Sequence, residues 1–593
     1  MHNRYACSVS SAARFRDSAR VSRWAPWLGL ATSLTAVFMQ LLDATIVNVA
    51  LPSIAVDLGA PVSTQLLMVS IYTLSFACAL ITAARLGDIL GRRRVFLAAL
   101  AAFVVASVLC GLATSGPALV VFRALQGLAA GSMSAQTFAI ISALFPKRAH
   151  PRVFGIYGAT IALATVSGPL AGGLLIEWNL FDLGWRMIFL INLPIGALAL
   201  IFGAVFLVDA RATRRPKLDP VGAVLSALGL VLLIYPLVEG RERGWPAPIV
   251  AMLVASIPVL ALFVWYEHRL GRRGGDPVLR LGLFRDSSFS RGALLALLFF
   301  GTLTSLIFTI SLTLQFGFGF SPLRAGITTL PWAIGTGIAA VLSSMVYRRI
   351  GNLVLPTGML LFGGSLLLTA EILGREGTDP RWLVLAGPLL LGGAGLGLFV
   401  APLQSAILAS VRPANSGSVS GLLPTIQQVG SSLGLALIGI VFFQFVAGQA
   451  DTAVNEQRPA FAARLESAGI PSSYVPQLET RFADCATAQL GSSSPMHVPD
   501  ECADAGTGAS AAPQAMVDSA LAAAHDATRA AAGEAFLVAQ QRVMWSIAGV
   551  SVVVAALSLT LPRRNRIVEP DALSSDDDAS DEPDNEPEPV PGR

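Results

Sequence analysis

Long apolar stretches, separated by short polar segments, recur along the whole chain. A helix needs about 20 apolar residues to cross the hydrocarbon of a bilayer. We expect fourteen membrane-spanning helices, at 27–50, 65–86, 95–113, 118–142, 153–177, 187–208, 219–239, 248–267, 290–316, 325–347, 353–373, 382–410, 419–447 and 539–561. The first stretch follows a basic segment, as in a signal peptide, but it is long, contains Asp43 and has no obvious A-x-A cleavage site. The pattern therefore predicts an all-α polytopic membrane protein.

The composition agrees with this prediction and excludes several other classes of protein. Of the 593 residues, 54% are hydrophobic and 13% are charged, whereas a soluble globular chain carries roughly 25% charged residues. The mean hydropathy is +0.65. None of the five histidines lies in an expected spanning helix, and these helices show no metal-ligand or nucleophile–base cluster. We therefore expect neither an enzyme nor a metal or cofactor, and the net charge of +4 does not indicate nucleic-acid binding.

Arginine and lysine indicate the side of the membrane on which each loop lies, because cytoplasmic loops carry an excess of both. One set of loops contains Arg92, Arg93, Arg94, Lys147, Arg148, Arg152, Arg211, Arg214, Arg215, Lys217, Arg269, Arg272, Arg273, Arg280, Arg285, Arg348, Arg349, Arg412, Arg563 and Arg564. The opposite short loops contain only Arg186, Arg241, Arg243, Arg324, Arg375 and Arg381. This asymmetry predicts a multi-pass protein of the cytoplasmic (cell) membrane with both termini in the cytoplasm.

Three segments are expected outside the membrane. Residues 1–26 form a basic cytoplasmic tail, and residues 562–593 form an acidic, Pro-rich tail of a kind that is disordered. The loop 448–538 is polar, Ala-rich and partly helical in pattern, and it faces the exterior. Cys485 and Cys502 share this oxidising location, so we expect a disulfide between them; two free thiols are the alternative.

A charge within the membrane is costly and usually functional, and Asp43 is the clearest case. It lies nine residues before Pro52, roughly 13 Å below the exterior boundary at 1.5 Å per residue. Arg123 lies six residues after Pro117, roughly 9 Å deep from the same face. The similar depths allow contact between the two side chains. A static ion pair that only sets helix packing is the alternative to a functional role.

The loop after the second spanning helix combines glycines with charge. Gly87 and Gly91 permit a tight turn, and Asp88 lies close in sequence to Arg92 and Arg93. This arrangement predicts a charge network between helices that forms in one conformation and breaks in another, and so acts as a conformational switch. Ordinary positive-inside charge explains the arginines, but it explains neither Asp88 nor the paired glycines.

The fifth spanning helix ends in a cluster of small residues around a proline. Gly168-Pro169-Leu170-Ala171-Gly172-Gly173 lets helices approach closely, and the proline frees a carbonyl and bends the helix. Helix packing alone is the simpler interpretation of this segment.

These segments together resemble the major facilitator superfamily, in particular its fourteen-spanner drug:proton antiporter (EmrB/QacA-like) branch. The loop from Arg85 to Arg94 is similar to the superfamily signature between spanning helices two and three, with Ala84 in place of the usual first glycine. Further segments resemble family motifs of spanning helices one, four, five and six and of the second half: Leu42–Pro52, Leu119–Gly127, Gly168–Gly173, Trp185–Gly196 and Ser321–Pro331. The fifth-helix motif is associated in the family with export.

The resemblance implies two six-helix bundles with two inserted helices between them. The N-terminal bundle would occupy 27–208, the inserted linker helices 219–267 and the C-terminal bundle 290–561. In the second half, only Arg348-Arg349-Ile350-Gly351 resembles the loop signature, in a degenerate form. Some multidrug relatives have a carboxylate where this chain has Gln427-Gln428, which argues against avid export of dications. The family tendency is monomeric.

The resemblance also implies a function, namely proton-coupled export of drugs or other amphiphilic small molecules by alternating access. Asp43 and Arg123 would be the proton-coupling pair, and with one clear acidic carrier we expect neutral or zwitterionic amphiphiles to be exported best. Glu371, near the exterior end of its helix, is a second candidate carboxylate. A dedicated exporter of one endogenous metabolite, such as a host-made antibiotic, is the alternative. Candidate pocket residues, for each of which core or lipid packing is the simpler role, are Phe299, Phe300, Phe308, Phe316, Phe318, Trp332 and Met359.

Overall fold

The computed structural model describes residues 19–60, 62–146, 149–207, 219–240, 243–279, 281–409, 416–491, 502 and 514–561, and its elements in these ranges are helices and helical turns. The acidic tail 562–593 and residues 1–18 of the basic tail lie outside the described residues.

The first half of the chain forms long helices joined by short turns. These are α2 (Ala19–Leu58), α3 (Val62–Leu90), α4 (Arg92–Gly111), α5 (Gly116–Leu144) and α6 (His150–Trp178). Short turns η2 (Leu180–Asp182) and η3 (Gly184–Arg186) and the single turn α7 (Met187–Leu190) lead into α8 (Asn192–Phe206). Two further helices follow, α9 (Pro220–Glu239) and α10 (Ala247–Arg272). Proline in the first turn of α5, α6, α9 and α10 suits a helix start, because no backbone donor is lost there.

The second half has the same construction, with longer helices toward its end. The turn η4 (Leu281–Arg285) precedes α11 (Ser287–Leu312), and a π-helical turn, η5 (Thr313–Gly317), separates α11 from α12 (Pro322–Ile350). The turn η6 (Gly351–Leu353) joins α12 to α13 (Val354–Glu376). The remaining helices are α14 (Trp382–Ala409), α15 (Ser416–Ser467), α16 (Val475–Gly491) and α18 (Gln514–Ser558).

Twelve helical segments within the described ranges are long and apolar enough to cross a membrane. The all-α, multi-pass membrane architecture predicted from the apolar stretches is therefore confirmed, whereas the number fourteen is not. One of the twelve segments, Leu323–Glu376, spans both α12 and α13, and α6 is not among them.

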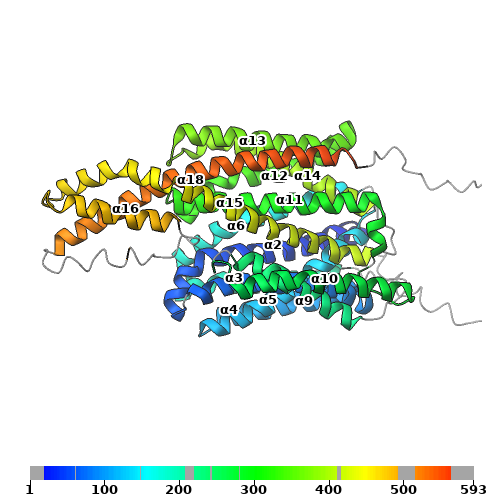
Figure 1. Cartoon of the computed structure of the whole chain (residues 1–593). Helices are drawn as coiled ribbons and strands as arrows, with labels where there is room; N and C mark the ends of the chain where they lie inside the picture. Colours follow the sequence, from blue (N-terminus) through cyan, green and yellow to red (C-terminus); the bar gives the residue numbers. More distant parts are fainter. Residues whose placement is uncertain are drawn as a thin grey trace, which may run out of the picture.

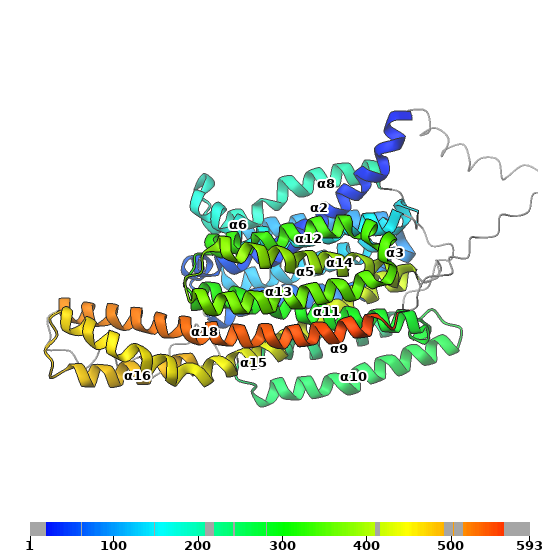
Figure 2. The same ribbon diagram turned by 90° about the horizontal axis from the view of Figure 1, so that it is seen from above.

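The two halves of the chain lie side by side, each around its own apolar core. In Figure 1 helices α3, α4 and α5 lie on one side of the molecule, and α12, α13, α14 and α18 lie on the other. One large buried cluster runs from Phe263 of α10 to Leu561 through the second half, whereas separate clusters fill the first half. Contacts between the halves run mainly through α6 against α12 and α14, and through α3 against α15. Helix α10 lies on the outside, beside α9 (Figure 2).

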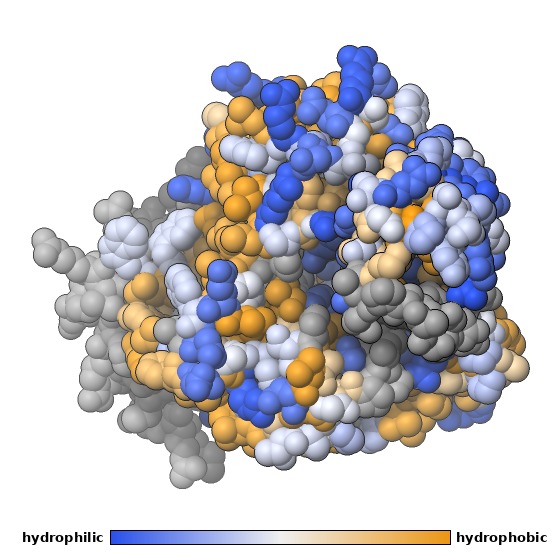
Figure 3. Space-filling view, turned by 90° about the vertical axis from the view of Figure 1, so that its left-hand side faces the viewer, coloured by the Kyte–Doolittle hydropathy of each residue, from blue (hydrophilic) through white to orange (hydrophobic). Residues whose placement is uncertain are grey.

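The start of α2 and the end of α18 lie at the same end of the molecule (Figure 2). The helix termini that carry arginine, namely the start of α4 and the ends of α10 and α12, belong to this end as well. We call this the arginine-rich end. From the opposite end α15, α16 and α18 project together beyond the other helices (Figure 1). On the face seen from this projecting end, hydrophilic side chains are interspersed with hydrophobic ones (Figure 3). Within the expected exterior loop 448–538, the projection is built by the described residues 448–491 and 514–538, because α15 and α18 continue into it without a break.

A disulfide joins Cys485, on α16, to Cys502 within this projection, with a Cα–Cα distance of 4.8 Å. Cys78 and Cys110 are free thiols within the helices.

Candidate functional site

Helix α2 brings Asp43 into the interior of the first half because small residues of α6 let the two helices approach closely. A Cβ on Gly168 would lie 1.9 Å from Thr45 Oγ1, and one on Gly172 would lie 3.0 Å from a side-chain carbon of Ile46. Both glycines of the motif therefore pack against the segment of α2 that directly follows Asp43. A Cβ on Gly173 would meet nothing within 4 Å, so this glycine is not required for the contact.

Asp43 is the centre of a buried polar cluster drawn from four helices. Arg123 of α5 donates to Asp43 Oδ2 in an ion pair. Asp43 Oδ1 accepts from Gln126 Nε2 of α5 at 2.8 Å and from Asn192 Nδ2 of α8 at 3.2 Å. Both amides also donate to Ser107 Oγ of α4, each at 2.9 Å. We call these five residues the Asp43 cluster.

Arg123 is held from several directions as well. Its Nε donates to the Met68 carbonyl at 3.2 Å, and its NH1 donates to Gln126 Oε1 at 2.8 Å. The guanidinium lies 4.2 Å from the centre of the Tyr72 ring, a favourable cation–π distance. Tyr72 reaches Arg123 because α3 and α5 touch: a Cβ on Gly127 would lie 2.4 Å from the Tyr72 carbonyl oxygen.

The Asp43 cluster is closed to solvent in this conformation. Asp43 and Arg123 each expose 1% of their surface, and Gln126, Asn192 and Ser107 expose none. A carboxylate removed from water needs a countercharge and hydrogen-bond donors to remain ionised, and both are present here. Loss of the Arg123 contact in another conformation would leave a buried carboxyl group that favours its protonated form. The arrangement can therefore bind and release one proton, provided that the helices move.

The residues predicted to form a switch lie at the arginine-rich end, where α3 ends and α4 begins. Asp88 and Arg92 form an ion pair at 3.0 Å, and Arg93 donates to the Ala204 carbonyl. Gly91 has φ +100°, a conformation that residues with a Cβ rarely adopt. A Cβ on Gly87 would lie 1.9 Å from Gln136 Oε1, so this glycine allows α3 to lie against α5.

The two halves also approach closely near this end. A Cβ on Gly155 of α6 would lie 2.3 Å from the Ala340 carbonyl oxygen of α12. A Cβ on Gly421 of α15 would lie 2.7 Å from Ala84 Cβ of α3. Glycines at both places permit close contact between the two halves near the arginine-rich end.

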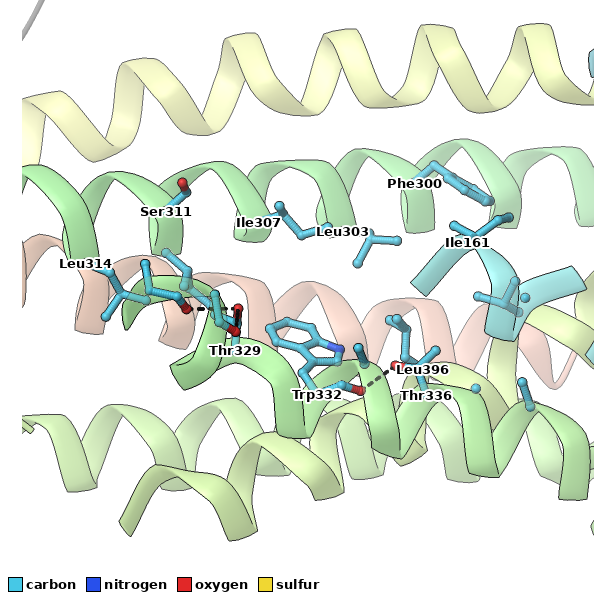
Figure 4. Close-up of a pocket in the computed structure, with 18 of the residues that line it drawn as sticks. Ile161, Phe300, Leu303, Ile307, Ser311, Leu314, Thr329, Trp332, Thr336 and Leu396 are labelled. Atoms are coloured by element: carbon cyan, nitrogen blue, oxygen red, sulfur yellow. Dashed lines mark hydrogen bonds between the residues drawn. The ribbon is translucent and has the colours of Figure 1, made fainter. Parts of the chain in front are cut away.

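A cavity of about 150 Å³ lies between α11, α12 and α14, with α6 of the first half along one edge. Its lining includes Phe300, Ile307, Gln315, Thr329, Trp332 and Leu396, and it contains no charged side chain. Figure 4 shows the Trp332 ring directed into the space between α11 and α12. The Thr336 hydroxyl donates to the Trp332 carbonyl at 2.9 Å. The cavity is apolar with a few uncharged polar groups, as ligand sites are, but it is smaller than the roughly 300–1,000 Å³ of sites that enclose a drug-sized molecule. In this conformation it would hold only part of such a molecule.

The structure separates the seven predicted pocket residues into three groups. Two of them, Phe300 and Trp332, line the cavity. Four pack in or against the apolar core of the second half, namely Phe299, Phe308, Phe318 and Met359. The remaining residue, Phe316, is 46% exposed. Glu371 forms an exposed ion pair with Arg375 at 2.8 Å, away from both the cavity and the Asp43 cluster.

Sequence reasoning did not assign a role to Ser107, Gln126 or Asn192. Gln126 and Asn192 lie inside two of the family-like segments, but single amides in apolar helices carry no pattern that distinguishes ligands of a carboxylate from packing residues. Only the convergence of α2, α4, α5 and α8 reveals their contact with Asp43.

These features define a multi-pass helical membrane protein with a buried ion pair in one half and an uncharged cavity mainly in the other. The model of the Major Facilitator Superfamily matches residues 33–435. The "Probable actinorhodin transporter" of Streptomyces coelicolor is 36% identical over 91% of this chain and 92% of its own length. The "Tetracenomycin C resistance and export protein" of Streptomyces glaucescens is 34% identical, over 71% of this chain and 76% of its own. The "Multidrug resistance protein Stp" of Mycobacterium tuberculosis is also 34% identical, over 70% and 75%.

The chain belongs to the Major Facilitator Superfamily. It is accordingly a membrane transporter and not an enzyme, as its sequence predicted.

Proposed function

We propose that the protein exports antibiotics or other amphiphilic drugs across the cytoplasmic membrane in exchange for protons. The names of its relatives, which refer to actinorhodin, tetracenomycin C and multidrug resistance, support export of such molecules. The observation that carries the proton coupling is the Asp43 cluster, since an ionisable group this deep in a membrane protein is usually functional.

We infer fourteen crossings in two six-helix bundles. Counting α12 and α13 separately and adding the 29-residue helix α6 raises the twelve membrane-length segments to fourteen. The N-terminal bundle would contain α2 to α8, the inserted pair α9 and α10, and the C-terminal bundle α11 to α15 with α18. The arginine-rich end faces the cytoplasm in this proposal, since cytoplasmic loops carry the excess of arginine. The closed contact at that end then makes this an outward-facing conformation with a sealed proton site.

Asp43 is the proposed proton carrier, and Arg123 is its counterion. Substrate entry from the cytoplasm and proton loss favour each other, and rocking of the two bundles then exposes both sites to the exterior. The ion pair between Asp88 and Arg92, with the glycines around it, would stabilise one of the two conformations. The packing of Gly168 and Gly172 against α2 links the motion of α6 to the position of Asp43.

The uncharged cavity and the single carrier favour neutral substrates. An inward proton gains about 2.3 kcal/mol per 100 mV and about 1.4 kcal/mol per pH unit. At 100 mV and one pH unit the total of about 3.7 kcal/mol sustains roughly a 500-fold gradient of a neutral molecule. Exchange of one proton for a monovalent cation moves no net charge, so only the pH difference drives it. One pH unit then sustains about a tenfold gradient of the cation. A planar aromatic molecule suits the cavity best, because Trp332 offers a ring for stacking.

A dedicated exporter of one host-made antibiotic is the second candidate function. It is favoured by the extent of one similarity: the probable actinorhodin transporter matches 91% of this chain, whereas the multidrug resistance protein matches 70%.

The proposed function is tested in inside-out vesicles that contain the protein. A neutral polycyclic aromatic compound and a permanently cationic analogue of similar size are offered under either a lumen-positive potential or an acid lumen. We expect either force to drive uptake of the neutral compound, and only the acid lumen to drive uptake of the cation. Uptake of the cation driven by potential alone would contradict exchange for a single proton. A vesicle that accumulates neither compound, nor any of a panel of candidate antibiotics, would contradict drug export.

A further inference from the structure

Two acidic side chains that take no part in the proposed transport cycle are buried where α9 begins and α10 ends. Asp219 caps α9: its Oδ1 accepts from the Gly222 amide and from the Tyr266 hydroxyl, each at 3.0 Å. Glu267, near the end of α10, accepts from the Leu279 amide through Oε2 at 2.9 Å. Asp219 is 5% exposed and Glu267 is 1% exposed. Each carboxyl group thus uses one oxygen to hold a neighbouring segment.

The second oxygen of each group has no such partner. Asp219 Oδ2 and Glu267 Oε1 are both buried, and neither accepts a hydrogen bond from the residues described. Both lie against the same glycine, since a Cβ on Gly222 would be 2.4 Å from Asp219 Oδ2 and 2.2 Å from Glu267 Oε1. The two oxygens therefore lie beside the same glycine and close enough for the two carboxyl groups to interact.

An ionised carboxylate accepts hydrogen bonds and donates none. Two facing, ionised carboxylates would leave both oxygens unsatisfied and would bring like charges together away from water. A single proton on either oxygen removes both penalties, because the protonated oxygen donates to the other. Gly222 leaves the space for this contact, and a side chain there would fill it.

We propose that Asp219 and Glu267 bind one proton between them, forming a proton-binding site separate from Asp43. The bound proton holds the end of α10 against the start of α9. This contact is important for the position of α10, because α10 lies on the outside and packs mainly against α9 (Figure 2). Loss of the proton leaves two facing negative charges, which separate the two helix ends.

The groups that face this pair connect it to the predicted switch. Arg85 of α3 is close enough to Glu267 for their charges to interact, and Tyr266 of α10 donates to Asp219. Arg85, Asp88 and Leu279 line one small cavity at this end. When the pair is deprotonated, Glu267 becomes a stronger partner for Arg85, which is three residues before Asp88. The pH at the arginine-rich end would in this way act on α3 through Arg85.

Infrared difference spectroscopy of the full-length protein in lipid nanodiscs tests this site. A protonated carboxyl group absorbs in a C=O stretching band that is absent from carboxylates. We expect one such band to be lost as pH is raised, and to be missing at every pH in Glu267→Gln, whose amide can donate to Asp219 in place of the proton. Tyr266→Phe leaves the facing oxygens intact and is the matched control, in which the band should persist.

Asp43→Asn separates this inference from the proposed function. The C=O band assigned to the Asp219–Glu267 pair should remain in Asp43→Asn, even if this variant no longer couples transport to protons. If Glu267→Gln does not fold, Asp219→Asn serves for the same measurement. An acid band that is unchanged in both Glu267→Gln and Asp219→Asn, or no acid band attributable to either residue in the wild-type spectrum, would overturn the shared proton.

Discussion

Replacing Gly168 with alanine is expected to push α6 away from α2 and to disturb the Asp43 cluster. The new Cβ would lie 2.7 Å from Thr45 Cβ, whereas carbon atoms in contact are about 3.5–4.0 Å apart. The helices must therefore separate by roughly 0.8 Å or more. Such overpacking typically costs about 1–3 kcal/mol. Because Thr45 lies two residues after Asp43 on α2, this displacement would also move the Asp43 carboxylate relative to its hydrogen-bond donors on α5 and α8.

Gly173→Ala is the matched control, because its Cβ would meet nothing within 4 Å. Both substitutions gain the same helix preference of alanine over glycine, about 0.5–1 kcal/mol, so the difference between the variants isolates the steric effect. We expect Gly168→Ala to melt at a lower temperature than Gly173→Ala in detergent, and to lose most substrate-dependent proton release in vesicles. Adding Thr45→Ala, which removes the nearest atom, should recover part of both losses. Equal melting temperatures and equal proton release in the two glycine variants would refute the reasoning.

Three further predictions concern single contacts. Trp332→Ala should weaken the binding of planar aromatic substrates by about 0.5–1.5 kcal/mol, which raises the transport KM roughly 2- to 12-fold. Trp332→Phe should keep most of the affinity, because it keeps a ring for stacking. Equal KM values in the two variants would contradict stacking. Asn192→Ala removes a donor to the Asp43 carboxylate, worth about 1.5–3 kcal/mol, so substrate-dependent proton release should fall; release equal to that of the wild type would contradict a role for this contact. Gly155→Ala should force α6 away from the Ala340 carbonyl and increase labelling of a cysteine introduced at the arginine-rich end; unchanged labelling would argue against closure there.

Apolar length and charge asymmetry predict much of this fold, because the bilayer imposes the same requirement on every crossing. The ends of the helices are predicted less well. The last crossing was expected to begin at residue 539, yet α18 begins at Gln514. Alanine-rich polar sequence continues the helix beyond the membrane, where hydropathy no longer reports on helix formation.

The candidate site could be predicted only in part. The similar depths of Asp43 and Arg123 were enough to anticipate their contact, which the structure contains. Gln126 and Asn192 could not be assigned, since a polar side chain in an apolar helix can serve packing equally well. The contact between Asp219 and Glu267 could not be predicted from the sequence for another reason. They lie at the margins of their spanning segments, where charge is usual, and only the packing of α9 on α10 turns their oxygens toward each other.

Asp57→Asn provides a matched control for the central test, because Asp57 lies on α2 like Asp43 but near its exposed end. Hydrogen bonds from Arg186 at 2.6 Å and from Trp185 at 3.0 Å hold the pKa of the Asp57 carboxyl below its usual value. This carboxylate therefore stays ionised at neutral pH, and its contribution to stability would be lost only as the pH falls through that lowered pKa. It is not expected to carry protons.

The central claim, that Asp43 carries the coupled proton, is tested most directly by lumenal pH in inside-out vesicles with an acid lumen. Substrate is added to vesicles containing the wild-type protein, Asp43→Asn or Asp57→Asn, and proton release from the lumen is followed. The account predicts substrate-dependent release in the wild type and in Asp57→Asn, and none in Asp43→Asn. Undiminished release in Asp43→Asn would contradict the account and move the proton to another group.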